Sequence, residues 1–213
     1  MAKRMKKQTT AEIRKVLRAA LKEDQFVEVR FDFEKRHRLA RVIEVSSDFL
    51  VYFELETNSM GYEGPNVVRL SSVQCANIES NKREFYTLGP ALLGHTKPTI
   101  PKIRLTSMAT VLTDLDKHYN CVCFDAPSKM RDACWIGQVK SVNRTTLEMS
   151  EINPDGRWDE DVSYFPLRAI THVSVNTGYV NALWLVANHL GKLEAEAEID
   201  DAAIKPKRKR TAT

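Results

Sequence analysis

The sequence has few glycines, few cysteines and no long apolar run, and each shortage excludes a class of protein. The 8 glycines among 213 residues are isolated, so none builds the glycine-rich loop that cradles a phosphate. No run approaches the roughly 18 apolar residues that a membrane-spanning helix needs. The basic start leads into an amphipathic segment and not into the apolar core of a secretory signal. We therefore expect a cytoplasmic protein without a membrane partner, whose 4 cysteines stay thiols.

Positive charge is concentrated at the two ends of the chain. Residues 1–8 and 205–210 together hold nine of the 32 basic residues and no acidic residue. An acidic stretch, 194–201, lies just before the second basic end and holds five of the 28 acidic residues. The body, 9–192, is then neutral, so the overall charge of +4 does not predict a basic surface on the fold.

The first part of the chain predicts a helix followed by five strands. Thr9 and Glu12 have the spacing of a capping box, and apolar residues then recur at helical spacing up to Leu21. The pattern changes to a period of two at residue 26, which is typical of strands. The predicted strands are 26–33, 38–45, 49–55, 67–73 and 75–78.

Residues 104–175 repeat this order of elements. Thr106 or Ser107 is expected to cap a second helix, and the stretch 164–175 repeats the pattern of 67–78. Val45 and Val142, Leu70 and Leu167, and Val73 and Ile170 are each 97 residues apart, whereas Phe31 and Phe124 are 93 apart. One four-residue insertion in the hairpin 126–133 accounts for the difference, because hairpin loops tolerate insertions. We infer two copies of one unit.

The fold class that follows is mainly β with flanking helices, as two tandem small barrels. Five short strands bury their apolar face best by curling into a barrel, with the helix over one opening. Three prolines in the joining segment predict a stiff, partly extended linker and not a helix. The predicted parts are a first barrel at 9–86, the linker at 87–104, a second barrel with a C-terminal helix at 105–190 and a charged disordered tail at 191–213. The final helix, 178–190, either caps the second barrel or mediates self-association.

Each unit ends with a pattern of three apolar residues at a spacing of three. The pattern resembles the Sm-like small-barrel family, which includes the bacterial host-factor RNA chaperone. The pattern is Leu70, Val73, Ala76 in the first unit and Leu167, Ile170, Val173 in the second. The stretch from 155 onward also resembles uncharacterised bacterial proteins. The Sm resemblance implies rings formed by paired strand edges and binding of single-stranded RNA by two loops of each unit. In this chain those loops fall at Ser46, Ser47, Asp48, Ser71 and Ser72, and at Asn143, Arg144, Thr145, Arg168 and Ala169.

Catalytic and metal-binding patterns are weak. Cys121 and Cys123 share one face of a strand, Cys134 begins the next strand and His118 precedes them, which raises the possibility of a metal cluster. A Cys-x-Cys pair on a strand places the sulfurs poorly for zinc, so buried thiols are the favoured interpretation. Asp32 and Asp125 occupy corresponding strand ends, which favours a structural role. No nucleophile is paired with a base, and we expect neither an enzyme, a cofactor nor a metal site.

Candidate nucleic-acid contacts lie in the turns and the tail. Arg157 and Trp158 follow a tight turn at 153–156 and could sandwich a base, unless Trp158 packs under the hairpin and Arg157 pairs with Asp159 or Asp161. Tyr62 is the counterpart in the first unit, and Arg144 lies in a further turn. The basic tail could neutralise phosphates or only aid solubility. Its candidate residues are Lys205, Lys207, Arg208, Lys209 and Arg210.

Three functions remain open at this point. The first is a binding protein for RNA or single-stranded DNA, in which the tails supply affinity. The second is an assembly or adaptor module with a protein partner or a second copy, which exposed apolar surface at Trp184 and Leu185 would favour. The third is a sensor of a nucleotide or other small ligand, which requires a pocket lined by both units.

Overall fold

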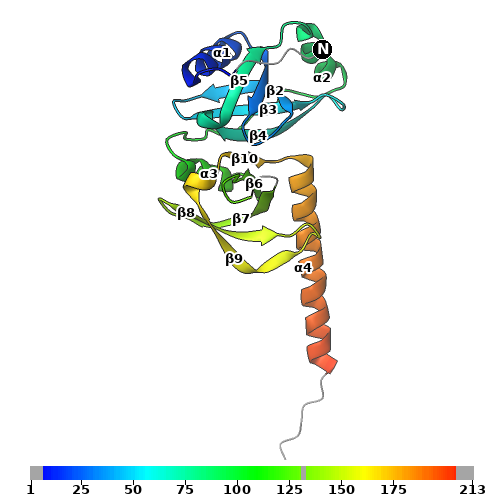
Figure 1. Cartoon of the computed structure of the whole chain (residues 1–213). Coiled ribbons are helices and arrows are strands. Elements are labelled where there is room, and N and C mark those ends of the chain that lie inside the picture. Colours follow the sequence, from blue (N-terminus) through cyan, green and yellow to red (C-terminus); the bar gives the residue numbers. More distant parts are fainter. Residues whose placement is uncertain (1–6, 131–132, 205–213) are drawn as a thin grey trace, which may run out of the picture.

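The computed structural model describes residues 7–130 and 133–204 and contains one antiparallel sheet of ten strands (Figure 1). The fold is mainly β with flanking helices, as the sequence predicted. The strands are β1 (Phe26–Phe31), β2 (His37–Val45), β3 (Phe49–Glu56), β4 (Gly61–Arg69), β5 (Val73–Ile78), β6 (Val122–Asp125), β7 (Cys134–Val142), β8 (Thr146–Ile152), β9 (Trp158–Pro166) and β10 (His172–Val175). The helices are α1 (Thr10–Lys22), α2 (Arg83–Leu92), α3 (Met108–Asp116) and α4 (Gly178–Ile204).

The order of elements repeats once along the chain. The first half contains α1 and the strands in the spatial order β5-β1-β2-β3-β4, and the second half contains α3 and the order β10-β6-β7-β8-β9. A short 3-10 turn precedes the last strand of each half, at Leu70–Ser72 and at Leu167–Ala169. The halves meet where β4 pairs with β10, so that the two five-stranded groups form one continuous sheet.

The first helix of each half, α1 and α3, begins with a predicted capping residue. The Thr9 hydroxyl accepts the backbone N–H of Glu12, and the Glu12 carboxylate accepts the backbone N–H of Thr9 at 2.7 Å. Ser107, one of the two predicted caps, accepts the N–H of Thr110 at the start of α3. These side chains satisfy backbone donors that a helix end otherwise leaves unpaired.

The hydrophobic core crosses from one half to the other. In the first half, α1 buries Ile13 and Leu17 against the sheet. The core of the second half also includes three first-half residues, Phe49, Val51 and Val67. Because the two halves share buried apolar area as well as a strand pairing, we expect each to stabilise the other.

The prediction of a non-helical segment at 87–104 was wrong for its first residues. Residues 87–92 belong to α2, and Pro90 lies within this helix and is buried. Tyr86 and Pro90 face inward, and Tyr86 packs with Met60 in a small cluster beneath the helix. This packing, together with the position of Pro90 in the last turn, outweighs the usual cost of proline in a helix. Residues 95–104 have no regular secondary structure.

The predicted C-terminal helix is longer than expected. It was predicted at 178–190 with a disordered tail from 191, but α4 continues to Ile204 and extends past the second half in Figure 1. The charged composition of 191–204 indicated disorder, although alanine and glutamate are strong helix formers and no proline interrupts them. The basic candidates of the tail, from Lys205 onward, lie outside the described residues.

Candidate ligand-binding groove

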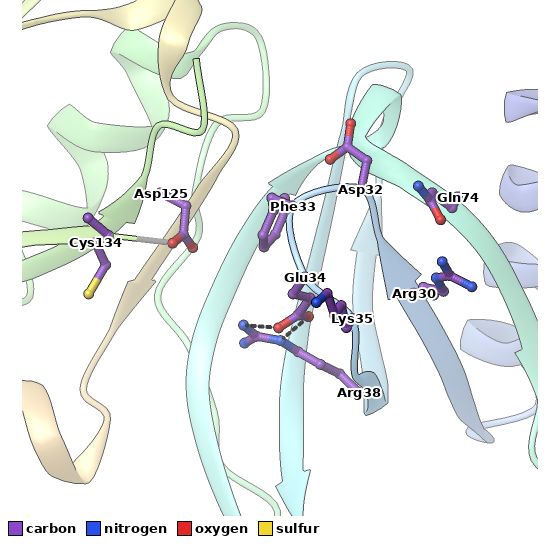
Figure 2. A pocket seen from close by; sticks show the side chains of 10 residues that line it. Arg30, Asp32, Phe33, Glu34, Lys35, Arg38, Gln74, Asp125 and Cys134 are labelled. Carbon is purple, nitrogen blue, oxygen red and sulfur yellow. Dashed lines mark hydrogen bonds and ion pairs between the residues drawn. The ribbon is translucent and has the colours of Figure 1, made fainter. Parts of the chain in front are cut away.

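A groove of about 570 Å³ lies between the two halves of the protein, and both halves line it (Figure 2). The first half contributes the end of β1 and the turn that leads to β2, and the second half contributes the facing ends of β6 and β7. The lining residues are Arg30, Asp32, Phe33, Glu34, Lys35, Arg38, Gln74, Asp125, Ala133 and Cys134. A neighbouring hollow of about 550 Å³ shares Asp32, Phe33 and Gln74 and reaches Arg168 on the second half.

A chain of hydrogen bonds joins the halves beside this groove. His172 of β10 is buried, and its Nδ1 lies 2.7 Å from the Asp125 carboxylate. Its Nε2 lies 3.0 Å from the side-chain oxygen of Asn66 on β4, which is also buried. The Asn66 amide nitrogen donates to the backbone oxygen of Glu63, so the amide orientation is fixed. These contacts link residues 106 positions apart and hold Asp125 in place at the groove.

An aromatic stack supports the same wall. Phe33 stacks on Phe31 with ring centroids 5.2 Å apart and on the His172 ring at 5.7 Å. Phe31 is fully buried, whereas Phe33 is half-buried and lines the groove. The stack therefore presents an apolar ring next to the charged side chains.

The acidic groups of the groove already have partners within the protein. Arg38 donates to Glu34 at 2.6 Å and to Glu54 at 2.9 Å, as the dashed lines in Figure 2 show for Glu34. Burial disfavours the charge of Arg38, but the surrounding Tyr52, Glu34 and Glu54 outweigh this effect and raise its pKa. Asp125 is held by His172. Glu34 and Glu54 therefore share the positive charge of Arg38, and Asp125 shares a hydrogen bond with His172.

Three basic side chains, in contrast, have no ion-pair partner among the described residues. Arg30 and Lys35 line the main groove, and Arg168 lines its neighbour. The Nε atom of Arg30 is buried and makes no hydrogen bond within the described part of the chain. A buried donor without a partner costs about 1–3 kcal/mol, which a bound acceptor would offset. The main groove therefore contains two basic groups without an ion-pair partner among the described residues, Arg30 and Lys35, together with the carboxylates of Asp32, Glu34 and Asp125.

The predicted nucleic-acid contacts do not come together in one place. Arg144 is exposed in the turn before β8, and Arg157 is exposed in the turn after it, so the length of the strand separates them. Tyr62 lies in the first half, where it stacks on Phe26 at 6.5 Å and accepts a hydrogen bond from Arg41. Only Arg157 and Trp158 are neighbours, as their adjacency in the sequence requires.

Arg157 and Trp158 contact helix α4. Trp158 is half-buried and packs against a cluster that includes Val180 and Leu183 of α4. Arg157 forms an ion pair with Glu194, and not with either of the two aspartates expected from the sequence. The preceding turn was predicted correctly, since Gly156 has a left-handed φ of 75°. Trp158 therefore packs against α4, and Arg157 contacts α4 through an ion pair between exposed side chains.

The loops that the Sm resemblance assigned to RNA are ordered by their own polar side chains. Ser46 accepts the N–H of Phe49 at 2.9 Å, and Asn143 accepts the N–H of Thr146 at 2.8 Å, at corresponding positions of the two halves. Ser71 and Arg168 lie exposed in the two 3-10 turns. Of all these loop residues, only Arg168 and Ala169 line one of the two hollows.

The cysteine and helix predictions have mixed outcomes. All four cysteines are free thiols, and only Cys75 and Cys121 are buried. No group of three metal-binding side chains occurs within the described ranges, so the cluster considered from the sequence is not formed there. Leu185 is exposed, as an interaction surface would require, but Trp184, also on α4, is only partly exposed and packs against the cluster that includes Cys121 and Ile136. None of the described helices has the length and apolar character to cross a membrane.

Sequence reasoning missed most residues of the groove. Asp32 and Asp125 were noticed because they repeat between the units, but Arg30, Phe33 and His172 showed no motif. The charged turn at 34–38 was visible in the sequence. Its place in a groove could not be predicted, because the opposite wall comes from the second half.

Comparison with known proteins gives no assignment. No family model matches the chain, and no curated protein matches it. Two solved structures of MrkH from K. pneumoniae align with 9% and 8% identity, the first of them in its apo state. The alignments cover 91% and 94% of this chain and 98% of each MrkH chain, with TM-scores of 0.17 and 0.16. Scores this low do not indicate a shared fold.

Proposed function

We propose that this protein is a non-enzymatic binding protein that takes a small anionic ligand, such as a nucleotide, in the groove between its two halves. The observation that carries the proposal is the presence of Arg30 and Lys35, without ion-pair partners among the described residues, in a groove lined by both halves. The volume of about 570 Å³ lies within the range of small-molecule sites.

The chemistry of the walls narrows the ligand class. Guanidinium and ammonium groups bind phosphate or carboxylate oxygens through charge-assisted hydrogen bonds. The half-buried ring of Phe33 offers an apolar surface beside these cations, against which a base could lie. A ligand with a charged part and a flat apolar part fits both features.

A ligand that contacts both halves would change the stability of the junction between them. A ligand that bridges Arg30 of the first half and the β6–β7 edge of the second would stabilise their junction, because it binds only the assembled form. The same junction contains the His172 bonds to Asp125 and Asn66. This arrangement suits a sensor that reports a small ligand through the rigidity of the whole molecule.

Calorimetric titration with AMP, GMP and inorganic phosphate tests the proposal. We expect one nucleotide to bind more tightly than phosphate, and Arg30→Gln to weaken it by about ten- to a hundredfold, as expected for loss of a hydrogen bond to a charged group. Lys35→Ala should weaken it less, because this side chain is exposed. Arg144→Ala is the matched control, since Arg144 is an exposed arginine outside the groove. Equal binding by wild type and Arg30→Gln would contradict the proposal.

A second candidate is binding of RNA or single-stranded DNA through the basic ends. The solvent-facing side of α1 exposes Lys15, Arg18 and Lys22, close in sequence to the basic N-terminal residues. Phosphate contacts of this kind give an affinity that falls steeply with salt. Deletion of 205–213 should lower the affinity for a single-stranded oligonucleotide and flatten its salt dependence. Unchanged binding would remove the C-terminal tail from this function.

The two halves themselves are proposed to be small barrels of the Sm-like type. The support is the shared strand order, the 3-10 turn before each last strand and the edge pairing of β4, the fourth strand of one half, with β10, the fifth strand of the other. An experimental structure in which β5 and β4 of the first half curve towards each other would support this proposal. A flat ten-stranded sheet would exclude it.

A further inference from the structure

The register of β6 and β7 brings two cysteines to one face of the sheet. Asp125 lies directly opposite Cys134, and Cys123 lies opposite Ile136. Because alternate residues of a strand share a face, Cys123 and Cys134 are diagonal neighbours on the same face. Diagonal Cα atoms of an antiparallel pair are about 7–8 Å apart, and their Cβ atoms are closer. A disulfide usually joins Cα atoms about 4.4–6.8 Å apart, so the bond requires β6 and β7 to move slightly closer at this point.

The two thiols differ in their access to solvent. Cys134 is exposed and lines the groove, where Figure 2 shows it beside Asp125. Cys123 is half-buried and lies opposite Ser174 of β10 in the neighbouring ladder. The other two cysteines are buried, and burial raises the pKa of Cys75 and raises that of Cys121 to about 12. Cys134 is therefore the most accessible of the four thiols.

The local electrostatics make Cys134 the reactive member of the pair. A hydrogen bond from Cys123 favours the Cys134 thiolate and lowers the pKa of Cys134 to about 7, although burial and Asp125 oppose the charge. The same hydrogen bond and burial raise the pKa of Cys123, which keeps its proton. A cysteine with a substantial thiolate fraction near neutral pH and access to solvent is the kind that peroxides oxidise.

We propose that Cys134 and Cys123 form an oxidation site, at which hydrogen peroxide converts the two thiols into a disulfide across strands β6 and β7. In the first step the Cys134 thiolate attacks one peroxide oxygen. A sulfur–oxygen bond forms, the oxygen–oxygen bond breaks, and the leaving hydroxide takes a proton to become water. In the second step the Cys123 sulfur attacks the Cys134 sulfenic acid, the sulfur–oxygen bond breaks, and the hydroxide leaves as water with the Cys123 proton. One peroxide is reduced to two waters, and two thiols are oxidised.

The bridge would form at the wall of the groove. It would tie together β6 and β7, the strands on either side of the segment in which the sequence places the four-residue insertion of the second half. The reaction requires no ligand and does not depend on the function proposed above.

Mass spectrometry of the full-length protein after treatment with hydrogen peroxide tests the site. We expect a loss of two hydrogen atoms, a cross-linked peptide that joins residues 123 and 134, and full reversal by dithiothreitol. Cys123→Ser should stop at a sulfenic acid on Cys134, which dimedone traps, and Cys134→Ser should form no bridge. Cys121→Ser is the matched control, because this buried thiol, which lies just before β6, should not affect the cross-link.

Alkylation by iodoacetamide provides a second readout that does not require a disulfide. The reaction should label Cys134 first, with half its maximal rate near the pKa of about 7. A cross-link to Cys121, or loss of no hydrogen in wild type, would overturn the proposal. Uniform alkylation of all four thiols in the folded protein would do the same.

Discussion

Replacement of Leu17 by alanine in the first half should weaken the second half as well. Leu17 lies on α1, is fully buried and belongs to the first-half core. Loss of a buried leucine side chain costs about 2–5 kcal/mol, and α1 packs so closely on the sheet that we expect about 3 kcal/mol. The two halves share the β4–β10 pairing, and Phe49, Val51 and Val67 of the first half lie in the second core. Unfolding should therefore be a single cooperative transition.

The distribution of tryptophan makes this prediction easy to measure. The three tryptophans, Trp135, Trp158 and Trp184, all lie in the second half, so their fluorescence reports that half alone, whereas far-ultraviolet circular dichroism reports both. With a urea m value near the upper end of the usual range, about 3 kcal/mol per molar, Leu17→Ala should move both midpoints down by about 1 M. The control Leu185→Ala, at an exposed position of α4, should move neither. A fluorescence midpoint unchanged by Leu17→Ala would show that the halves unfold independently and would refute the reasoning.

Two further predictions concern the second half. Hydrogen bonds from Arg104, opposed in part by burial, and a further bond from Lys117 hold the pKa of Asp114 well below its usual range, so its folded value is below its unfolded value. The contribution of Asp114 to stability is thus present above the unfolded pKa of about 3.9 and is lost as the pH falls through the folded pKa. Thermal unfolding of Asp114→Asn, measured across this pH range, should lack this part of the acid dependence. Identical pH profiles of the variant and the wild type would contradict the prediction. A Cβ atom at Gly137 would lie 2.0 Å from the backbone oxygen of Ser150, so Gly137→Ala should separate β7 from β8 and lower stability by about 1–3 kcal/mol, measured by urea unfolding. Gly178→Ala is the matched control, because a Cβ atom there would make only an ordinary contact with Glu63 at 3.7 Å.

Local patterns of the sequence predicted the elements well, and long-range contacts explain what they missed. The capping residues Thr9 and Ser107 and the left-handed Gly156 were predicted because their effect depends only on nearby backbone. Helix α2 was missed because its stability despite Pro90 depends on long-range packing, in which Tyr86 contacts Phe26 and Met60 of the first half. The extent of α4 was missed because charged composition was interpreted as disorder, whereas Arg157 holds Glu194 from a turn 37 residues away in sequence.

The residues of the candidate site also depend on long-range contacts that the sequence does not show. The adjacency of Arg157 and Trp158 in the sequence suggested a base-binding pair, but the sequence could not show that Trp158 would pack against α4 or that Arg157 would pair with Glu194. The groove exists only because β4 pairs with β10, which brings Asn66 to His172 and the turn after β1 to the ends of β6 and β7. A pairing register between strands more than 100 residues apart has no local signal, so the residues of the groove carried no motif.

The charges around Asp125 connect the proposed ligand site with the proposed oxidation site. Asp125 lines the groove, is bonded to His172 and lies opposite Cys134 in the ladder. While Cys134 is a thiolate, it adds a second negative charge beside this carboxylate, which disfavours an anion near Arg30 and Lys35. A neutral disulfide would remove that charge and favour the anion, and by linkage a bound anion would favour the disulfide over the thiolate at equilibrium. The sign of this coupling follows from the charges alone, so the reduced protein should be the weaker binder of the two forms.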